Sequence, residues 1–226
     1  MRKIVLGLFT ALLAAGCGSS TKLSLSTSAG SGTSGAALTA GPSGELKITR
    51  VRMVVDRIKL VSVNSADDSS TDSPNDEVVA GPYLIDLKDA ALDSGITQVF
   101  QVDAKAGTYK NLKFRIHKLD SNESQFPEMS RQSIIVEGTV NGSPFTPFTS
   151  DVNEEQKVQG TFNLADGQEN NVTLSIDPSG WFTAADGTLL DPNLAVNNGE
   201  IRSKIEAKIK ASIKAFDDHD RNGKRD

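Results

Sequence analysis

The residues best suited to chemistry lie in the last nine positions of the chain, where oxygen-bearing side chains recur at every second residue. Asp218, Asp220 and Asn222 carry carboxylate or amide oxygens, and Gly223 follows where a loop can turn sharply. Ca²⁺ prefers hard oxygen ligands and takes about six to eight of them. The spacing therefore predicts a calcium loop, in which Lys224 contributes its backbone carbonyl and the last residue binds directly or through water. The predicted ligands are Asp218, Asp220, Asn222, Lys224 and Asp226.

This segment resembles the D-x-D-x-N-G loops of EF-hand-like, dockerin-like and thrombospondin-type repeats. The expected role of the Ca²⁺ is structural, because it would pin the terminal helix to the sandwich. The segment departs from the EF-hand pattern because the chain stops before the bidentate glutamate of the twelfth position. A further ligand must then come from the terminal carboxylate, from Asp217, or from a loop such as Ala185-Asp186-Gly187. The alternative is an acidic tail without metal, and Mg²⁺ fits less well because it demands stricter octahedral geometry.

A second chemical feature is the only cysteine, Cys17, which ends a leader-like segment. Arg2 and Lys3 give a positive start, an apolar run extends from Ile4 to Leu13, and small residues lead to Cys17. This is the pattern of a cleavable signal peptide, and its apolar run is too short for a permanent membrane span. The sequence thus predicts a signal peptide over residues 1–16, with cleavage that makes Cys17 the first residue. An ordinary secretory signal followed by an incidental cysteine is the alternative.

The residues before Cys17 resemble the lipobox of bacterial lipoproteins, although Ala14 stands where that family usually has leucine. The resemblance implies that the Cys17 thiol carries diacylglycerol and that its amino group is often acylated, which together make a durable membrane anchor. Gly18, rather than an aspartate, follows the cysteine. By the same resemblance this favours the cell envelope, and in a Gram-negative bacterium the outer membrane.

The composition is that of one soluble domain: 37% of residues are hydrophobic, 23% are charged and the net charge is −5. Collagen, coiled coil and bulk disorder are excluded. Removal of the leader with Arg2 and Lys3 makes the charge more negative, which argues against nucleic acid as a partner. Residues 17–44 are rich in Ser, Gly and Thr and contain no acid. They are predicted to be a disordered tether that carries the lipid, with a reach of about 30 Å.

Residues 45–197 contain short segments rich in Val, Ile, Thr and Phe, separated by turn residues, which predicts an antiparallel two-layer β-sandwich of Ig-like or Greek-key type. In the first of these segments, which begins after Gly44, the alternating apolar residues move from odd-numbered to even-numbered positions, and so from one face to the other, near Asp56-Arg57, which indicates a β-bulge. The dipeptide Asn141-Gly142 predicts a hairpin between its flanking strands. The other strands are expected at Tyr83–Leu87, Ile96–Ala104, Thr108–Leu119, Ile134–Val140, Phe145–Ser150, Val158–Leu164 and Val172–Ile176.

Residues 198–216 fit two periods, because isoleucines recur every fourth residue while apolar and polar residues also alternate. The length and the content of Ala, Lys, Glu and Arg favour a helix, with Asn198 as its N-cap. Its basic residues form a solvated face, and contact with an anionic membrane is the alternative. Residues 217–226 then form the acidic loop.

No catalytic residue is predicted, because the sequence has no G-x-S-x-G elbow and no histidine pair at zinc spacing. Acids such as Asp56, Asp86, Asp103 and Glu137 could form a glycosidase pair only if two of them met in a cleft. Trp181-Phe182 is the one conspicuous aromatic pair, and it is interpreted as a plug of the core, with a ligand-binding surface as the alternative.

The order of features resembles surface lipoproteins with an uncharacterised, carboxypeptidase-regulatory-like β-sandwich. The residues that carry this resemblance are Ala106-Gly107-Thr108-Tyr109 with Leu112-Lys113-Phe114, and the segment from Asp177-Pro178 through Trp181-Phe182 to Asp191-Pro192. The sequence therefore predicts a lipid-anchored, non-enzymatic module that is stabilised by calcium and binds a protein or glycan, acts in adhesion, or has a structural role. The alternatives are a secreted carboxylate-dependent hydrolase and a subunit of an envelope complex.

Overall fold

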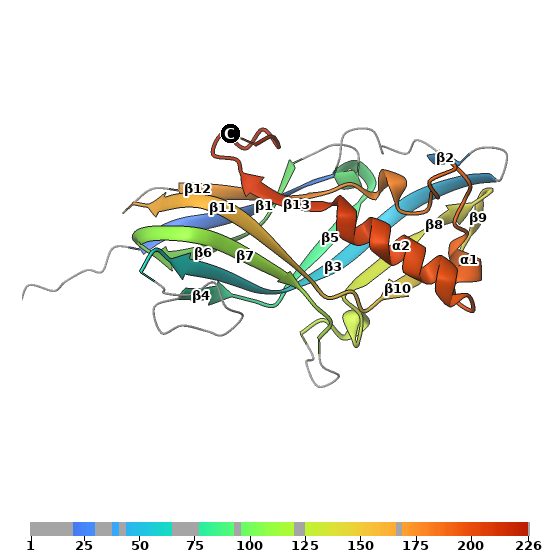
Figure 1. The fold of residues 1–226 in the computed structure, drawn as a ribbon, viewed down its shortest axis with the longest axis horizontal. Coiled ribbons are helices and arrows are strands. Elements are labelled where there is room, and N and C mark those ends of the chain that lie inside the picture. The colour runs from blue at the N-terminus through green and yellow to red at the C-terminus, as the bar shows by residue number, and fades with distance from the viewer. Residues whose placement is uncertain are drawn as a thin grey trace, which may run out of the picture.

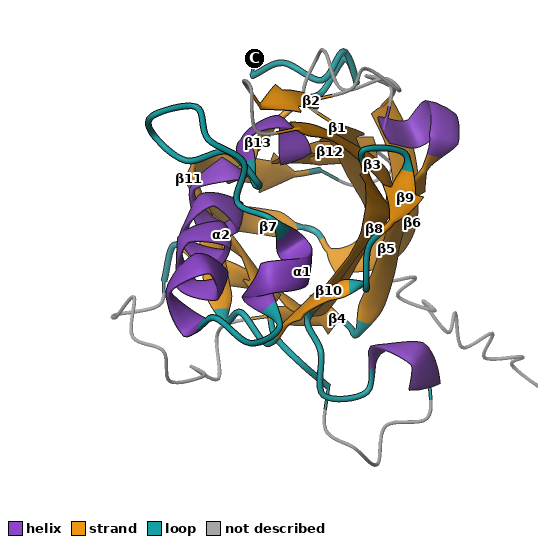
Figure 2. Ribbon diagram, turned by 90° about the vertical axis from the view of Figure 1, so that its right-hand side faces the viewer, coloured by secondary structure: helices purple, strands orange, loops and turns teal. Residues whose placement is uncertain are grey.

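The computed structural model describes residues 20–29, 38–40, 44–64, 77–92, 96–119, 125–165 and 169–225. In these residues the chain forms two β-sheets, and the long helix α2 (Gly199–Ser212) lies beside the strands (Figure 1, Figure 2). The predicted β-sandwich with one C-terminal helix is confirmed. The short helical segments are η1 (Asp89–Leu92), η2 (Pro127–Met129), η3 (Pro178–Gly180) and α1 (Pro192–Ala195).

The smaller sheet has the strand order β13-β12-β1-β6. β1 pairs with β6 in antiparallel orientation but with β12 in parallel orientation, so this sheet is mixed, whereas a wholly antiparallel sandwich was expected. Both edges of β1 are paired, which makes it an interior strand. The bounds are β1 (Ser20–Ala29), β6 (Ile96–Lys105), β12 (Glu169–Ile176) and β13 (Ile213–Asp217).

The larger sheet is organised around the 19-residue strand β3 (Gly44–Ser62), in the order β10-β8-β3-β7-β11. β8 pairs with the first part of β3, and β7 pairs with the second part. The register with β7 shifts between Val55 and Arg57, which confirms the predicted bulge. The other bounds are β2 (Leu38–Ala40), β4 (Glu77–Ala80), β5 (Tyr83–Lys88), β7 (Gly107–Ile116), β8 (Ile134–Val140), β9 (Ser143–Pro144), β10 (Phe148–Ser150) and β11 (Glu154–Leu164).

The predicted hairpin after β8 is also confirmed, because β8 pairs with both β9 and β10. Asn141 and Gly142 have φ values of 49° and 77°. Positive φ at both central residues is what a tight hairpin turn requires, and Asn and Gly adopt it most readily.

The aromatic pair belongs to the core, as predicted. Trp181 is fully buried, and its indole Nε1 donates a hydrogen bond to the Ser212 hydroxyl at 2.6 Å. Phe182 is buried beside Phe148, with the ring centroids 5.8 Å apart in an edge-to-face arrangement. The pair therefore joins the end of α2 to the interior and presents no aromatic surface to a ligand.

The prediction of a disordered tether is wrong for residues 20–29, which form β1, and for residues 38–40, which form β2 and pair with β3. Leu23 and Leu25 enter the main core, and the hydroxyl side chains between and after them are buried as well. One of these, Ser26, donates to Asn171 Oδ1 on β12 at 2.8 Å. Ser and Thr can therefore fill a buried strand when their hydroxyls find partners. Residues 17–19, 30–37 and 41–43 of the predicted tether lie outside the described residues.

The prediction of a helix to residue 216 is wrong at its end. α2 begins after the predicted N-cap Asn198, whose side chain accepts hydrogen bonds from the amides of Glu200 and Ile201, but the helix ends at Ser212. Ile213–Asp217 pairs with β12 as β13, because the alternating pattern there allows Ile213 to be buried opposite Ile176.

Candidate functional site

The C-terminal loop is fastened to the smaller sheet by Asp218, which is fully buried. Its Oδ1 accepts the amide of Asn222 at 2.8 Å, and its Oδ2 accepts the amide of Gly223 at 3.0 Å. Oδ2 also accepts the hydroxyl of Thr173, on β12, at 2.6 Å. These three hydrogen bonds to a carboxylate satisfy a buried acid and fix where the loop leaves the sheet.

The remaining predicted ligands lie in the same tight turn. Asp220 accepts the side-chain amide of Asn222 at 2.6 Å, and Asn222 Oδ1 accepts the amide of Lys224 at 2.8 Å. Arg221 and Gly223 have positive φ values of 57° and 76°, which close the turn. The structure thus brings Asp218, Asp220, Asn222 and Lys224 together, whereas Asp226 lies outside the described residues.

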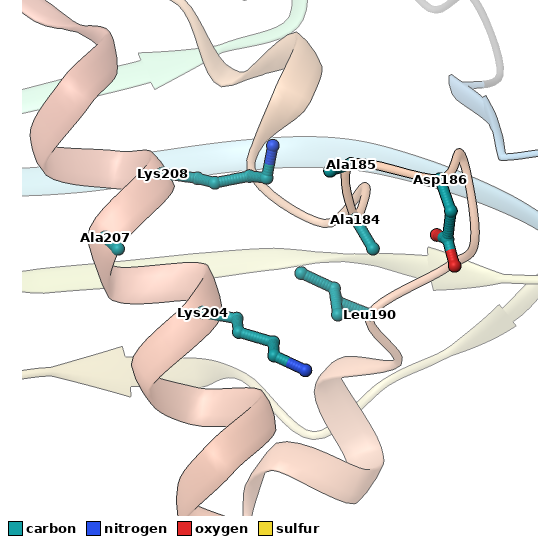
Figure 3. Close-up of a pocket in the computed structure, with 7 residues that line it drawn as sticks. All are labelled: Ala184, Ala185, Asp186, Leu190, Lys204, Ala207 and Lys208. Atoms are coloured by element: carbon teal, nitrogen blue, oxygen red, sulfur yellow. The ribbon is translucent and has the colours of Figure 1, made fainter.

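The loop's donor set fits calcium only in part. Carboxylate and amide oxygens are suitable ligands, but those of Asp218, Asp220 and Asn222 already accept hydrogen bonds from within the loop. In the part of the chain that the structure describes, no group of three or more His, Cys, Asp or Glu could hold a metal ion. Asp186, a candidate for the further ligand, lines the pocket beside α2 instead (Figure 3). The calcium site stays a prediction.

The proposed lipidation site, Cys17, lies outside the described residues, but the start of β1 is defined. Lys22 is paired in register with Glu169 on one side and Asp103 on the other, and its Nζ lies 2.5 Å from Asp103 Oδ1. Among the helices of the described residues, none has both the length and the apolar character that a membrane span requires.

The four candidate acids of a hydrolase are distributed over four separate ion pairs. Asp86 accepts two hydrogen bonds from the Arg50 guanidinium, each 2.7 Å long. Asp103 pairs with the first lysine of β1. The other two pairs are Arg115 with Asp56 and Arg52 with Glu137. Each of the four acids thus has a cationic partner, and the charge of Glu137 also acts on Arg50, the partner of Asp86.

A pocket of about 470 Å³ lies between α2 and the segment that follows the aromatic plug (Figure 3). Its apolar lining is formed by alanines and by the buried Leu190. Lys204 and Lys208 extend from α2 toward the opposite segment, which carries Asp186 (Figure 3). The lining residues are Ala184, Ala185, Asp186, Leu190, Lys204, Ala207 and Lys208. The sequence did not predict this pocket, since its lining comes from two segments with no shared motif.

The charged side chains at the pocket differ in whether they already have a partner. Lys204 Nζ lies 2.6 Å from Glu200 Oε1, and this contact raises the pKa of Lys204. Asp186 accepts the amide and hydroxyl of Thr188, and these hydrogen bonds lower the pKa of Asp186. Lys208 forms no ion pair with any acid of the described residues. The pocket therefore combines two lysines and one aspartate with an apolar lining.

Comparisons with known proteins identify no family. No protein-family model and no curated protein matches this sequence. Among solved structures, the fold is similar to MbnP from Methylosinus trichosporium, with a TM-score of 0.34 and 12% sequence identity, over 72% of this chain and 76% of that one. A similarity this distant supports no inference about the function of this chain.

Proposed function

We propose that this protein is a lipid-anchored, non-catalytic binding module of the cell envelope, in a Gram-negative host the outer membrane. We further propose that its ligand is a small anionic molecule with an apolar part. The observation that carries the binding role is the pocket beside α2, because an apolar floor under two lysines complements a carboxylate attached to a hydrocarbon group. Lys208 supplies the cation that can pair with the ligand's acid.

The arrangement of acids supports a binding role over a hydrolytic one. A glycosidase needs two carboxyl groups about 5 to 9.5 Å apart, and one of them must hold a proton. The four candidate acids pair with arginine or lysine instead. Pairing with a cation favours the ionised form, as the lowered pKa of Asp86 illustrates, and thus works against a general acid.

Binding can be tested with octanoate as the probe, by NMR or isothermal titration. We expect saturable binding, with chemical shift changes at Ala184 and Leu190. Lys208→Glu should weaken binding several-fold. Ala207→Trp should fill the pocket and abolish binding. Lys210→Glu is the matched control, since it changes the charge of α2 equally at an exposed position outside the pocket. If Lys208→Glu and Lys210→Glu weakened octanoate binding equally, a specific site at the pocket would be refuted.

Anchoring is tested separately. When the full chain is expressed in a Gram-negative host, it should incorporate labelled fatty acid and fractionate with the outer membrane, and Cys17→Ser should release it in soluble form. Incorporation of label by the Cys17→Ser variant, or a soluble wild-type protein, would refute the proposed anchor.

Calcium binding by the C-terminal loop is a further part of the proposal, and it is supported by the clustering of Asp218, Asp220 and Asn222. Millimolar Ca²⁺ should raise the thermal unfolding midpoint, while Mg²⁺ at the same concentration should raise it less. Asp220→Ala should remove the calcium response; its side chain is exposed, so the metal-free protein should remain folded. An unchanged midpoint of the wild type in calcium would refute the site.

A further inference from the structure

The link between the proposed anchor and the folded domain is short, because β1 begins at Ser20, three residues after Cys17. Three residues span at most about 11 Å when fully extended. The predicted reach of about 30 Å assumed that residues 18–44 were free, and β1 removes that freedom. If Cys17 carries lipid, the start of β1 must stay close to the membrane surface.

The start of β1 cannot leave the domain easily to lengthen this link. Thr21 is fully buried, and Ser20, Thr21 and Lys22 pair in register with β6. From Lys22 onward the strand also pairs with β12. Peeling residues 20–22 away would break the ladder with β6, and at Lys22 the ladder with β12 as well, and would expose polar backbone groups. The anchor is therefore attached to a firmly held point of the sandwich.

The pairings define which parts of the molecule share this end. Ser20 lies opposite Lys105, at the turn from β6 to β7, and Lys22 lies opposite Glu169, at the beginning of β12. The C-terminal loop belongs to the same end, because Arg221 NH2 donates to Glu169 Oε2 at 2.7 Å. Figure 1 places α1 at the opposite end of the long axis.

We propose that the end of the sandwich formed by the start of β1, the β6–β7 turn and the 218–225 loop lies against the phospholipid headgroups, and that α1 points away from the membrane. This orientation rests on the proposed acylation of Cys17. The chemistry of the end suits the headgroup layer, because it consists mainly of charged and polar side chains, with ion pairs such as Lys22–Asp103 and Arg221–Glu169. Such a surface contacts headgroups without entering the hydrocarbon.

The orientation also assigns a position to the rest of the molecule. Leu194 and Val196, with exposed fractions of 58% and 51%, lie in or beside α1 and thus far from the bilayer. These apolar side chains therefore do not serve as membrane contacts. Helix α2, for whose basic residues an anionic membrane was the alternative partner, likewise runs along the domain toward α1 (Figure 1).

The test places a fluorophore at either end of a protein held at residue 17. The chain that starts at Cys17 is coupled through its thiol to a maleimide phospholipid in phosphatidylcholine vesicles that contain a headgroup-nitroxide lipid. An azide-bearing amino acid, introduced in place of Ala165 near the membrane end or Asn197 near α1, carries the fluorophore; both positions are exposed. Quenching should be several-fold stronger at position 165, and equal quenching or stronger quenching at 197 would overturn the proposal.

A variant with a longer link between Cys17 and β1 shows whether the short link, or an affinity of the protein surface for lipid, holds this end at the membrane. Insertion of twenty Gly and Ser residues between Ser19 and Ser20 adds a reach of about 25 Å, so quenching at position 165 should fall to the level at 197. Retention of the difference would mean that the surface itself binds lipid, which would also overturn the argument from the link. Because coupling to Cys17 is chemical, these outcomes do not depend on acylation in the cell and are distinct from failure of the proposed anchor.

Discussion

Gly138 lies on β8 where the neighbouring strand β3 comes very close. A Cβ atom there would stand 2.1 Å from the backbone oxygen of Lys47 and 2.8 Å from Phe145 Cε1. Because the oxygen belongs to a strand ladder, it cannot move without loss of pairing. Gly138→Ala should lower the free energy of unfolding by about 1 to 3 kcal/mol, as measured by urea denaturation. Gly180→Ala is the control, since nothing lies within 4 Å of its added Cβ, and an equal loss in both variants would contradict the steric explanation.

The Arg50–Asp86 pair gives stability a dependence on pH. The hydrogen bonds from Arg50 hold the pKa of Asp86 below its usual range. Because the pKa of Asp86 is lower in the folded protein than in the unfolded chain, the ion pair stabilises the fold fully at any pH above the pKa of the unfolded chain. This stabilisation is lost as the pH falls through the pKa of the folded protein. Both side chains are about one-third exposed, so the pair should contribute only about 0.5 kcal/mol.

Asp86→Asn should therefore reduce stability slightly at pH 7 and by less at pH 2, because the contribution of the ion pair is lost as the pH falls through the lowered pKa of Asp86. Urea denaturation of both proteins at the two pH values measures the difference. Greater destabilisation at pH 2 than at pH 7 would contradict the assigned role of this pair.

At the scale of single residues, the sequence predicted which groups of the C-terminal loop would gather, because alternate residues in a turn lie close together. It could not reveal that Thr173 would hold this loop on β12, since Thr173 and Asp218 are 45 positions apart. The pocket was missed for a related reason. Alanines and lysines are common on surfaces, and only the approach of α2 to residues 184–190 makes a cavity of them.

At the scale of elements, β1 is the strand whose packing differs most from expectation. Leu25 is 1% exposed and belongs to the main core. Leu25→Ala should lower the free energy of unfolding by about 2 to 5 kcal/mol, measured by urea or thermal denaturation. Leu194→Ala, at a position 58% exposed, should change it by less than about 0.5 kcal/mol. A negligible effect at Leu25 would mean that β1 is not an integral strand.

The expected and observed elements differ for identifiable physical reasons. The strand Ile134–Val140, which begins with three β-branched apolar residues and is followed by Asn141-Gly142, was predicted at its observed bounds. β1 escaped prediction because Ser and Thr supply most of its side chains, and these residues are equally typical of flexible chain. The end of α2 was misplaced because residues 213–217 satisfy both periods, and pairing with β12 decides between them.

At the scale of the whole molecule, the domain does not begin at residue 45, where the composition changes. A chain of residues 45–226 would leave β6 and β12 with unpaired edges and would open the core over Leu23 and Leu25. We expect it to aggregate or to lack fixed tertiary structure, because exposed strand edges promote association. Size-exclusion chromatography and near-UV circular dichroism, against residues 17–226, measure this. A monomeric, native-like 45–226 protein would contradict the assignment.

The position of β1 between β6 and β12 also determines the order of events during folding. Ser26 on β1 and its partner Asn171 on β12 are 145 positions apart. β1 is therefore synthesised early and cannot pair with β12 until that strand has also been synthesised. Contacts over such distances form slowly because a long loop must close first. The smaller sheet thus remains incomplete during most of synthesis. If the leader is cleaved as proposed, this delay would keep the beginning of the chain accessible to the processing enzymes until the remainder has emerged.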